Sequence, residues 1–225
     1  MVDNSGCGRA RALLPQGGSA RVIENTSNVG FGAAVNQGIK ASQSAYVLVL
    51  NDDAVASSHW VETLVRAAEQ RPGAGMFASQ VRLQSTDLLD SAGMLICGDA
   101  SSTQRGHGEP AQRYGESSKA LFPSGSAALY KRRMLEEIGG FDDDFFLYCE
   151  DTDLGMRARW AGWDCVYVAD AIVEHRYSHS AGRASALKAY LVERNRLYVA
   201  MKNFPLSMLL AVPFLYSFAV SLCPS

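Results

Sequence analysis

Carboxylates and large aromatic side chains are interleaved in residues 139–159. The acids of this stretch are Asp142, Asp143, Asp144, Glu150, Asp151 and Asp153, and the aromatic residues are Phe141, Phe145, Phe146 and Tyr148. A solvated acidic surface does not need the aromatic residues, and a buried core does not accept carboxylates without partners. The mixture indicates an acidic cleft with apolar walls. Such walls can raise the pKa of a carboxyl group, which makes one of these acids a candidate general base.

The same acids also suit the first turn of a helix. Negative charge there is favoured by the helix dipole, typically by ~0.3–1 kcal/mol, so Glu150, Asp151 and Asp153 predict a helix that ends at Gly162. Acids in the first turn of a helix can stabilise it without having any catalytic role. Acidity by itself therefore leaves both interpretations open, and the rest of the chain has to discriminate between them.

A second group of polar residues lies at the ends of expected strands. Residues 45–50 form an uninterrupted apolar run, which predicts a strand buried on both faces of a largely parallel sheet. The run ends at Asn51, Asp52 and Asp53, and ligands of open α/β sheets bind beyond the carboxyl ends of strands. His175 follows another expected strand. Oxygen ligands with one imidazole suit Mg²⁺ or Mn²⁺, although an acidic turn and a structural histidine explain each residue taken singly.

Other strands and helices must position these groups. Strands are expected at residues 21–25, 45–50, 75–83, 88–95, 121–130, 164–168 and 171–174, and helices at residues 29–41, 58–70, 131–138, 150–161 and 184–202. Small residues at 124–126 suit the close approach of a ligand or of another backbone. Residues 97–118 are rich in Gly, Ser, Gln and charge, so a mobile loop that closes over a substrate is expected there.

Composition limits the classes of protein that fit. The chain has 225 residues, 48% of them hydrophobic, so it can bury one substantial core and is most simply a single domain. Its formal net charge is -2 and it has no long basic cluster, so nucleic acid is not an expected partner. The five cysteines are scattered without a C-x-x-C pair, which favours neither a disulfide framework nor a zinc site and indicates a reducing cytosol.

Residues 203–225 carry no charged side chain. A spanning helix needs ~20 apolar residues, and Pro205 and Pro213 interrupt this segment, so a membrane-surface or re-entrant element is favoured over a full span. A helix packed on the domain's own core fits the pattern equally well. The helix before the tail carries Lys188, Arg194, Arg196 and Lys202. A basic helix beside an uncharged tail suits an anionic membrane surface.

Several of these segments together carry a resemblance to a known family. They are Val2-Asp3-Asn4, Asn28-Val29-Gly30-Phe31-Gly32 with Asn36 and Gly38, Leu50-Asn51-Asp52-Asp53, Gly139-Gly140-Phe141-Asp142, residues 145–154, and His175. In this order they resemble glycosyltransferase family 2, especially its rhamnosyltransferase-like members, over residues 2–203. The resemblance implies an α/β GT-A fold, with a Rossmann-like, mostly parallel sheet flanked by helices. It also implies a nucleotide-sugar donor, Mg²⁺ or Mn²⁺, and inversion at the anomeric carbon.

The resemblance also implies roles for single residues. By position, Asp151 is the general base, Asp53 and His175 are metal ligands, and the donor-binding residues are Asp3, Asn28, Gly30, Asn36, Asp52 and Glu150. Two departures stand out. Family members begin with a further strand and helix, so this chain is expected to lack the first strand. The Asp-x-Asp motif reads Asn51-Asp52-Asp53, so an amide replaces its first carboxylate.

Two hypotheses of different class follow. The first is an inverting glycosyltransferase, with residues 1–203 as its catalytic domain and residues 204–225 as an apolar helical tail. It moves a sugar such as rhamnose to a polysaccharide or lipid-linked acceptor, in the cytoplasm at the inner face of the cell membrane, with a peripheral membrane contact. The second is a truncated, catalytically silent fragment that binds a membrane or a protein partner.

Overall fold

The chain was analysed as a computed structural model that describes residues 1–13, 20–176 and 185–221. The first elements are β1 (Val2–Asp3), α1 (Arg9–Leu13), β2 (Ile23–Glu24), α2 (Phe31–Lys40), β3 (Tyr46–Leu50), β4 (Ala54–Ala56), α3 (Trp60–Gln70), β5 (Ala74–Leu83), β6 (Leu89–Ser91), β7 (Met94–Ile96) and β8 (Ser102–Gln104). The others are the 3-10 helix η1 (Ala111–Tyr114), β9 (Ser118–Ala120), β10 (Ala127–Lys131), α4 (Arg132–Ile138), the 3-10 helix η2 (Asp143–Phe145), α5 (Glu150–Trp160), β11 (Asp164–His175), α6 (Ala186–Asn203) and α7 (Leu206–Ser221).

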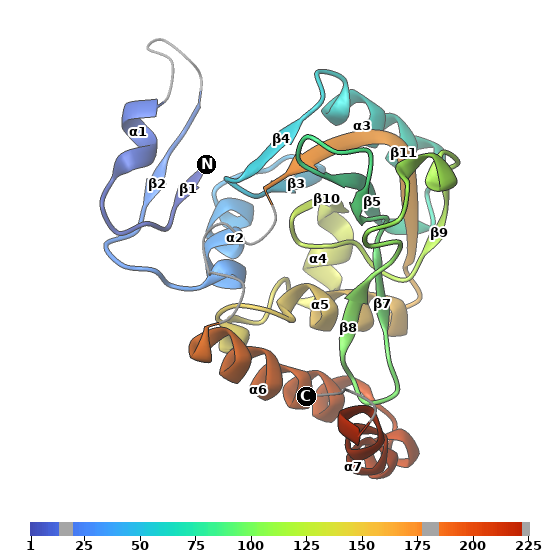
Figure 1. The fold of residues 1–225 in the computed structure, drawn as a ribbon. Helices are drawn as coiled ribbons and strands as arrows, with labels where there is room; N and C mark the ends of the chain where they lie inside the picture. The colour runs from blue at the N-terminus through green and yellow to red at the C-terminus, as the bar shows by residue number, and fades with distance from the viewer. Residues whose placement is uncertain (14–19, 177–184, 222–225) are drawn as a thin grey trace.

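A central sheet with the strand order β3-β10-β5-β11-β4 organises the fold, with β6 paired to β5 and β9 to β11. The α/β class is as predicted, but the strand directions are mixed rather than mostly parallel. β5 and β11 run parallel, whereas β10 is antiparallel to β3 and β5, and β4 is antiparallel to β11. β1 and β2 form a separate parallel pair beside α2 (Figure 1).

The expectation for β3 was wrong in one respect. β3 ends the strand order and is mostly half-buried, whereas β5, two strands further in, is buried from Ala74 to Val81. An apolar run indicates that a strand faces apolar neighbours, and it carries no information on which strand pairs with it or in which direction. The sheet position of β3 therefore depends on β10, whose residues 127–131 pair with it.

Helices cover both faces of the sheet (Figure 1). Along β5 successive side chains point to opposite faces, so Met76 and Ala78 join one core cluster while Phe77 and Val81 join the other. The second cluster packs under α3, and the first lies against α2, α4 and α5. The first cluster therefore forms the floor beneath the acidic helix α5.

Residues 97–118 are not the irregular loop that was expected. β7 and β8 form an antiparallel hairpin, followed by η1 and β9. Arg105 stabilises this segment, because its Nε donates to the carbonyl oxygen of Ala92 at 2.9 Å and its guanidinium lies over the rings of Tyr114 and Tyr167. The contact with Tyr167 of β11 joins segments far apart in the sequence, so local composition could not reveal it. The two strands expected at 164–168 and 171–174 are one strand, β11, with a register shift between Val168 and Ile172.

The first part of the apolar tail packs on the domain's own core. Phe204 and Val212 are buried in the first cluster, whereas Leu206 and Leu210 are 71% and 67% exposed. α7 continues through Pro213, where an interruption was expected. Among the described residues, no helix combines the length and the apolar character that crossing a bilayer requires.

Gly155 marks the tightest contact between α5 and the core. A Cβ built on Gly155 would lie 2.2 Å from Cβ of Phe122, which is fully buried. Gly in a helix interior is ordinarily less stable than Ala by roughly 0.5–1 kcal/mol, so here close packing outweighs helix propensity.

We expect Gly155→Ala to lower the free energy of unfolding by about 1–3 kcal/mol, because overpacking forces Phe122 or α5 to move. Urea unfolding measures this change. Gly73→Ala is the matched control, since a Cβ there meets no atom within 4 Å. Equal stability of the Gly155→Ala variant and the wild type would contradict the packing argument.

Candidate active site

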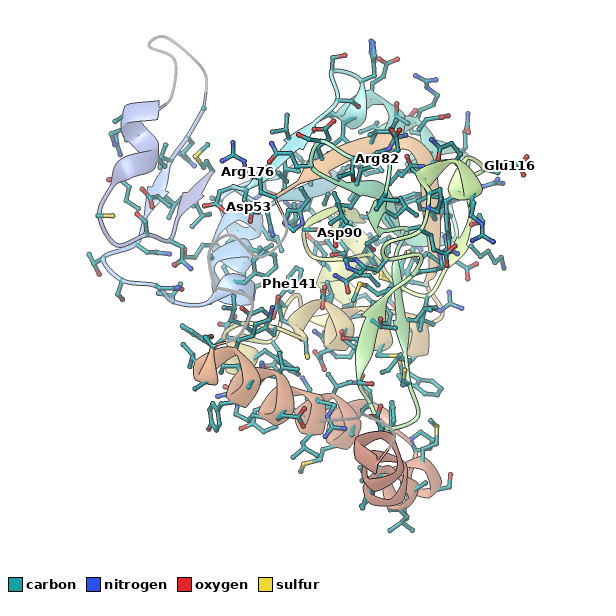
Figure 2. The ribbon with its side chains drawn as sticks, viewed as in Figure 1. Asp53, Arg82, Asp90, Glu116, Phe141 and Arg176 are labelled. Atoms are coloured by element: carbon teal, nitrogen blue, oxygen red, sulfur yellow. The ribbon has the colours of Figure 1, made fainter. Side chains whose placement is uncertain are left out.

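The ends of β3 and β11 bring the predicted metal ligands together. Asp53 follows β3, and His175 is the last residue of β11, where it pairs with Ala54 of β4. Nε2 of His175 lies 3.0 Å from Oδ1 of Asp53. On its other side, Nδ1 of His175 lies 2.8 Å from Oδ2 of Asp90 on β6. Figure 2 labels Asp53 and Asp90, the two acids that contact His175.

Both ring nitrogens of His175 therefore face carboxylate oxygens. A carboxylate only accepts hydrogen bonds, so both contacts form together when the imidazole carries a proton on each nitrogen. Burial by itself lowers the pKa of His175, but the hydrogen bonds and charges of Asp90 and Asp53 outweigh it and raise the pKa above its ordinary value. The pocket around His175 thus stabilises positive charge.

A divalent cation shared with a nucleotide would take the place of the proton between Nε2 of His175 and Oδ1 of Asp53, because a metal-bound imidazole is neutral. Within residues 1–13, 20–176 and 185–221, no three His, Cys, Asp or Glu side chains gather as a ready-made metal site. Mg²⁺ in nucleotide sites is usually held by one or two protein ligands together with phosphate oxygens and water, so Asp53 and His175 suffice as the protein's share. Asp90 would then orient His175 from behind, as carboxylates commonly do for metal-bound histidines.

Asp151 occupies the first turn of α5, next to this strand end. Its Oδ2 accepts a hydrogen bond from the backbone N–H of Gly125 at 2.9 Å, and its Oδ1 accepts one from Thr152 at 2.7 Å. The carbonyl oxygen of Ser126, the residue after Gly125, accepts from the backbone N–H of Asn51 at 2.9 Å. Residues 125–126 therefore connect the candidate base directly to the Asn51-Asp52-Asp53 motif.

The three acids of α5 lie in different environments. Asp153 is fully buried and paired with Arg157 at 2.7 Å, Lys202 at 3.0 Å and Asn203 at 3.0 Å, so its charge is used in packing α6 on α5. Glu150 is buried, and its Oε2 has no hydrogen-bond partner among the described residues. Asp151 is the acid that accepts a hydrogen bond from the segment that leads to Asp53.

Burial shifts the pKa values of these acids. Burial raises the pKa of Asp151, although hydrogen bonds from Gly125 and Thr152 oppose the shift. Burial, and then the charge of Asp151, raise the pKa of Glu150 to about 8. A carboxylate with a raised pKa is a stronger base, which suits Asp151 for taking a proton from a hydroxyl group.

The raised pKa of Glu150 predicts a pH dependence of stability. The unfolded chain loses this proton near the ordinary pKa of 4.5, whereas the folded chain keeps it up to about 8. Stability of the wild type should therefore fall as pH rises through this window, because ionisation favours the unfolded state. Glu150→Gln mimics the neutral acid, so its stability relative to the wild type should increase as pH is raised from about 5 to about 8. Urea unfolding at both pH values tests this, and a pH-independent difference would contradict it.

The loop before α5 has an unusual backbone. Phe146, Tyr148 and Cys149 have positive φ angles of 61°, 71° and 66°, and each such non-glycine residue costs on the order of 1–3 kcal/mol. The carbonyl oxygen of Phe146 accepts a hydrogen bond of 2.7 Å from Phe31 at the start of α2. A Cβ on Gly30 would lie 2.5 Å from that oxygen, so this glycine allows the segment before α2 to approach the loop.

Two predicted donor residues on the α2 side make structural contacts. Asn36 donates through Nδ2 to the carbonyl oxygen of Phe141 and to Oδ1 of Asp143, both at 2.8 Å. Asn28 is exposed, and its Oδ1 accepts from the N–H of Gly30 at 2.9 Å. Asn36 therefore ties α2 to the loop before α5, and Asn28 shapes the backbone at Gly30.

The remaining predicted donor residues lie apart from each other. Asp3 is buried on β1, in the separate two-stranded pair, and accepts backbone hydrogen bonds from Ser5 and Ala10, both at 2.9 Å. Asp52 is exposed in the turn between β3 and β4. Sequence reasoning missed Asp90, because a single acid in an expected hairpin arm carries no sign that it will be buried. It also missed the contact of Gly125 with Asp151, although small residues at 124–126 signalled a close approach.

The arrangement of strand-end acids, acidic helix and mixed sheet is that of a GT-A glycosyltransferase. Among solved structures, the chain is similar to GalNAc-T7 with UDP, GalNAc and Mn²⁺, with a TM-score of 0.69 and 14% identity, over 89% of this chain and 40% of that one. It is also similar to Staphylococcus aureus TarS 1-349, with a TM-score of 0.59 and 13% identity, over 97% of this chain and 62% of that one. At such low identities the similarity shows the fold alone.

The chain belongs to glycosyltransferase family 2. Residues 7–200 match the family described as "Glycosyltransferase like family 2". An N-acetylglucosaminyl-diphospho-decaprenol L-rhamnosyltransferase of Mycobacterium tuberculosis is 31% identical over 221 residues, covering 84% of this chain and 70% of that protein. The O-antigen biosynthesis protein RfbC of Myxococcus xanthus is 28% identical over 192 residues, covering 78% of this chain and 14% of that protein. The expected family, with its rhamnosyltransferase-like character, is thereby confirmed.

Proposed function

We propose that this chain is an inverting glycosyltransferase that transfers rhamnose or a related sugar from a nucleotide diphosphate to a lipid-linked or polysaccharide acceptor. The observation that carries the proposal is the position of Asp151. Its carboxylate is held by the N–H of Gly125, one residue from the Ser126 carbonyl that binds the Asp53-bearing turn. Similarity to an N-acetylglucosaminyl-diphospho-decaprenol L-rhamnosyltransferase supports the choice of sugar and acceptor.

In the proposed reaction, the acceptor hydroxyl oxygen attacks the anomeric carbon from the face opposite the leaving diphosphate. The bond from the anomeric carbon to the acceptor oxygen forms as the bond to the phosphate oxygen breaks, so the configuration inverts. The Asp151 carboxylate takes the hydroxyl proton, and its raised pKa suits this role. Asp53 and His175 would hold Mg²⁺ or Mn²⁺, which when bound would offset the charge that grows on the diphosphate.

The donor pocket in this proposal lies between the N-terminal segment and α5. Gly30 and Phe31 contact the loop before α5, so these residues form one side of the proposed donor site. Asp3, Asn28, Asn36, Asp52 and Glu150 remain proposed donor-side residues. Asn28 and Asn36 act by shaping the backbone of this pocket.

A panel of nucleotide sugars tests the proposal. We expect one donor to raise the melting temperature in the presence of Mn²⁺ and then to be transferred to a diphospho-lipid acceptor carrying N-acetylglucosamine. NMR of the product should show the inverted anomeric configuration. Nucleotide binding without turnover of any donor would instead favour the catalytically silent binding module.

We further propose that residues 1–203 form the catalytic domain, while α6 and α7 contact a membrane on the cytoplasmic side. Large apolar side chains are exposed along these two helices: Leu187, Tyr190, Leu197, Met201, Leu206 and Leu210. The basic residues of α6 contribute less positive charge to the proposed membrane surface than expected. Arg196 is buried against Asp99 and Glu193, and Lys202 pairs with Asp142, so two of the four positive charges are used within the domain.

We expect the protein to sediment with phosphatidylcholine vesicles, with a modest increase when anionic lipid is added, because apolar burial dominates this contact. A Met201→Ser, Leu206→Ser, Leu210→Ser variant should remain in the supernatant. Deleting residues 204–225 is a poorer test, because Phe204 and Val212 belong to the core. Val55→Ser with Val61→Ser is the matched control, since both residues are exposed but lie outside these helices. Loss of sedimentation in the control, or its retention in the triple variant, would contradict the assignment.

A further inference from the structure

A single buried amide on α6 holds the loop that precedes the acidic helix. Asn195 is fully buried, and its Nδ2 donates to the carbonyl oxygens of Phe145 at 2.8 Å, Leu147 at 2.8 Å and Tyr148 at 2.6 Å. An amide nitrogen has two N–H donors, so these three carbonyls use its whole donor capacity. Asn195 is 48 residues from Leu147 along the chain, so the contact is purely tertiary.

Neighbouring groups fix the orientation of this amide. Arg194 donates through Nε to Oδ1 of Asn195 at 2.9 Å, which turns the nitrogen of the amide towards the loop. The same guanidinium also donates to the carbonyl oxygen of Phe145 at 2.9 Å. The rings of Phe145 and Tyr198 meet edge to face at 6.0 Å. α6 therefore holds residues 145–148 in place through both hydrogen bonds and aromatic packing.

The backbone conformation of this loop determines where α5 begins. Phe146, Tyr148 and Cys149 hold positive φ angles, and such conformations persist only where their surroundings enforce them. Cys149 is the N-cap of α5 but has no side-chain capping hydrogen bond. The N-cap position, two residues before Asp151, is thus positioned by the loop rather than by a side-chain hydrogen bond. On its other side, the loop accepts the Phe31 hydrogen bond from the donor-side helix.

We infer that Asn195 is a positioning residue for the candidate base, holding residues 145–148 so that Asp151 meets Gly125 and the acceptor hydroxyl. The inference rests on the proposed function, in which Asp151 is the base. Asn195 touches no reacting group and acts through the loop. The structure accounts for why a polar side chain lies fully buried at this place in α6: an apolar residue would remove the donor to the carbonyls of Leu147 and Tyr148 and leave Phe145 with the donor from Arg194.

Two substitutions separate hydrogen bonding from packing. Asn195→Leu keeps a side chain of similar volume and removes the donors, whereas Asn195→Ala removes both. In each variant, hydrogen exchange of amides 146–151 should accelerate while exchange in α3 stays unchanged. Turnover per folded molecule should fall roughly 10²-fold, the cost typical of a misplaced catalytic group, at nearly unchanged affinity for the nucleotide donor.

Asn203→Ala is the matched control, because Asn203 is a buried asparagine on the same helix that donates to Asp153 of α5 and not to the loop. It should lower the melting temperature without changing loop exchange or turnover. In addition, Asn195→Ala combined with Asp151→Asn should turn over within about twofold of Asp151→Asn alone, because residues that act as one unit are not additive.

Unchanged loop exchange in both Asn195 variants, or a full additional loss in the double variant, would overturn the inference. Failure of both variants to fold would also overturn it and would assign Asn195 to the core. If Asp151→Asn keeps full turnover, the proposed base is wrong, and the exchange measurement still reports whether Asn195 holds the loop.

Discussion

Asp151→Asn should lower turnover by ~10²–10⁴-fold, the usual cost of losing a positioned general base, at nearly unchanged donor affinity. The amide keeps the size of the carboxyl group, and its single oxygen can still accept from the N–H of Gly125 while the hydrogen bond from Thr152 is lost, so most of the local structure should persist. It cannot take the proton of the acceptor hydroxyl. Donor binding depends on Asp53, His175 and the nucleotide pocket instead. Steady-state rates at saturating donor and calorimetric titration of the nucleotide measure the two quantities separately.

Replacing other acids by their amides tests whether Asp151, and not another acid, is the general base. Asp170→Asn, at an exposed position of β11 away from α5, controls for the loss of a surface charge. Asp153→Asn should destabilise the fold, because Asp153 is buried between Arg157 and Lys202. Near-full turnover in Asp151→Asn, together with an inactive Glu150→Gln or Asp153→Asn, would show that another acid of α5 faces the acceptor.

Asp53→Ala should weaken Mn²⁺-dependent nucleotide binding by more than ~10²-fold, beyond the 10–100-fold typical of residues that only support a ligand. The fold should survive, because Asp53 lies in the turn after β3 and its partner His175 keeps its contact with Asp90. Titration of the nucleotide diphosphate with and without Mn²⁺ gives the change directly, and circular dichroism reports on folding.

Two further variants test whether the loss of nucleotide affinity is specific to Asp53. Asp52 is exposed in the same turn, so Asp52→Ala should have a smaller effect than Asp53→Ala. Asp90→Asn should fall in the 10–100-fold range, since Asp90 contacts His175 and not the expected ion. Unchanged nucleotide affinity of Asp53→Ala in the presence of Mn²⁺ would remove Asp53 from the role of ligand.

Local patterns were sufficient for the elements that bear the chemistry. The acids at 150, 151 and 153 and the stop at Gly162 predicted α5, which spans Glu150–Trp160. The apolar run before Asn51 predicted β3, and the glycine-spaced segment predicted α2. These features are encoded within a few residues, because helix dipoles, strand patterns and turns are local properties. The order of motifs along the chain was enough for the family as well.

The sequence by itself therefore determined the family, the α/β class and the residues that are candidates for chemistry. Only the tertiary structure decided strand direction, the regular structure within residues 97–118, and the different environments of three neighbouring acids. Asp153 became part of a buried ion pair, Glu150 a buried acid whose Oε2 has no hydrogen-bond partner among the described residues, and Asp151 the acid that accepts from Gly125. Asp90 and Asn195 acquired their roles in the same way. Their partners lie 85 and 48 residues away, and burial and hydrogen bonding at such separations arise only when the core has packed.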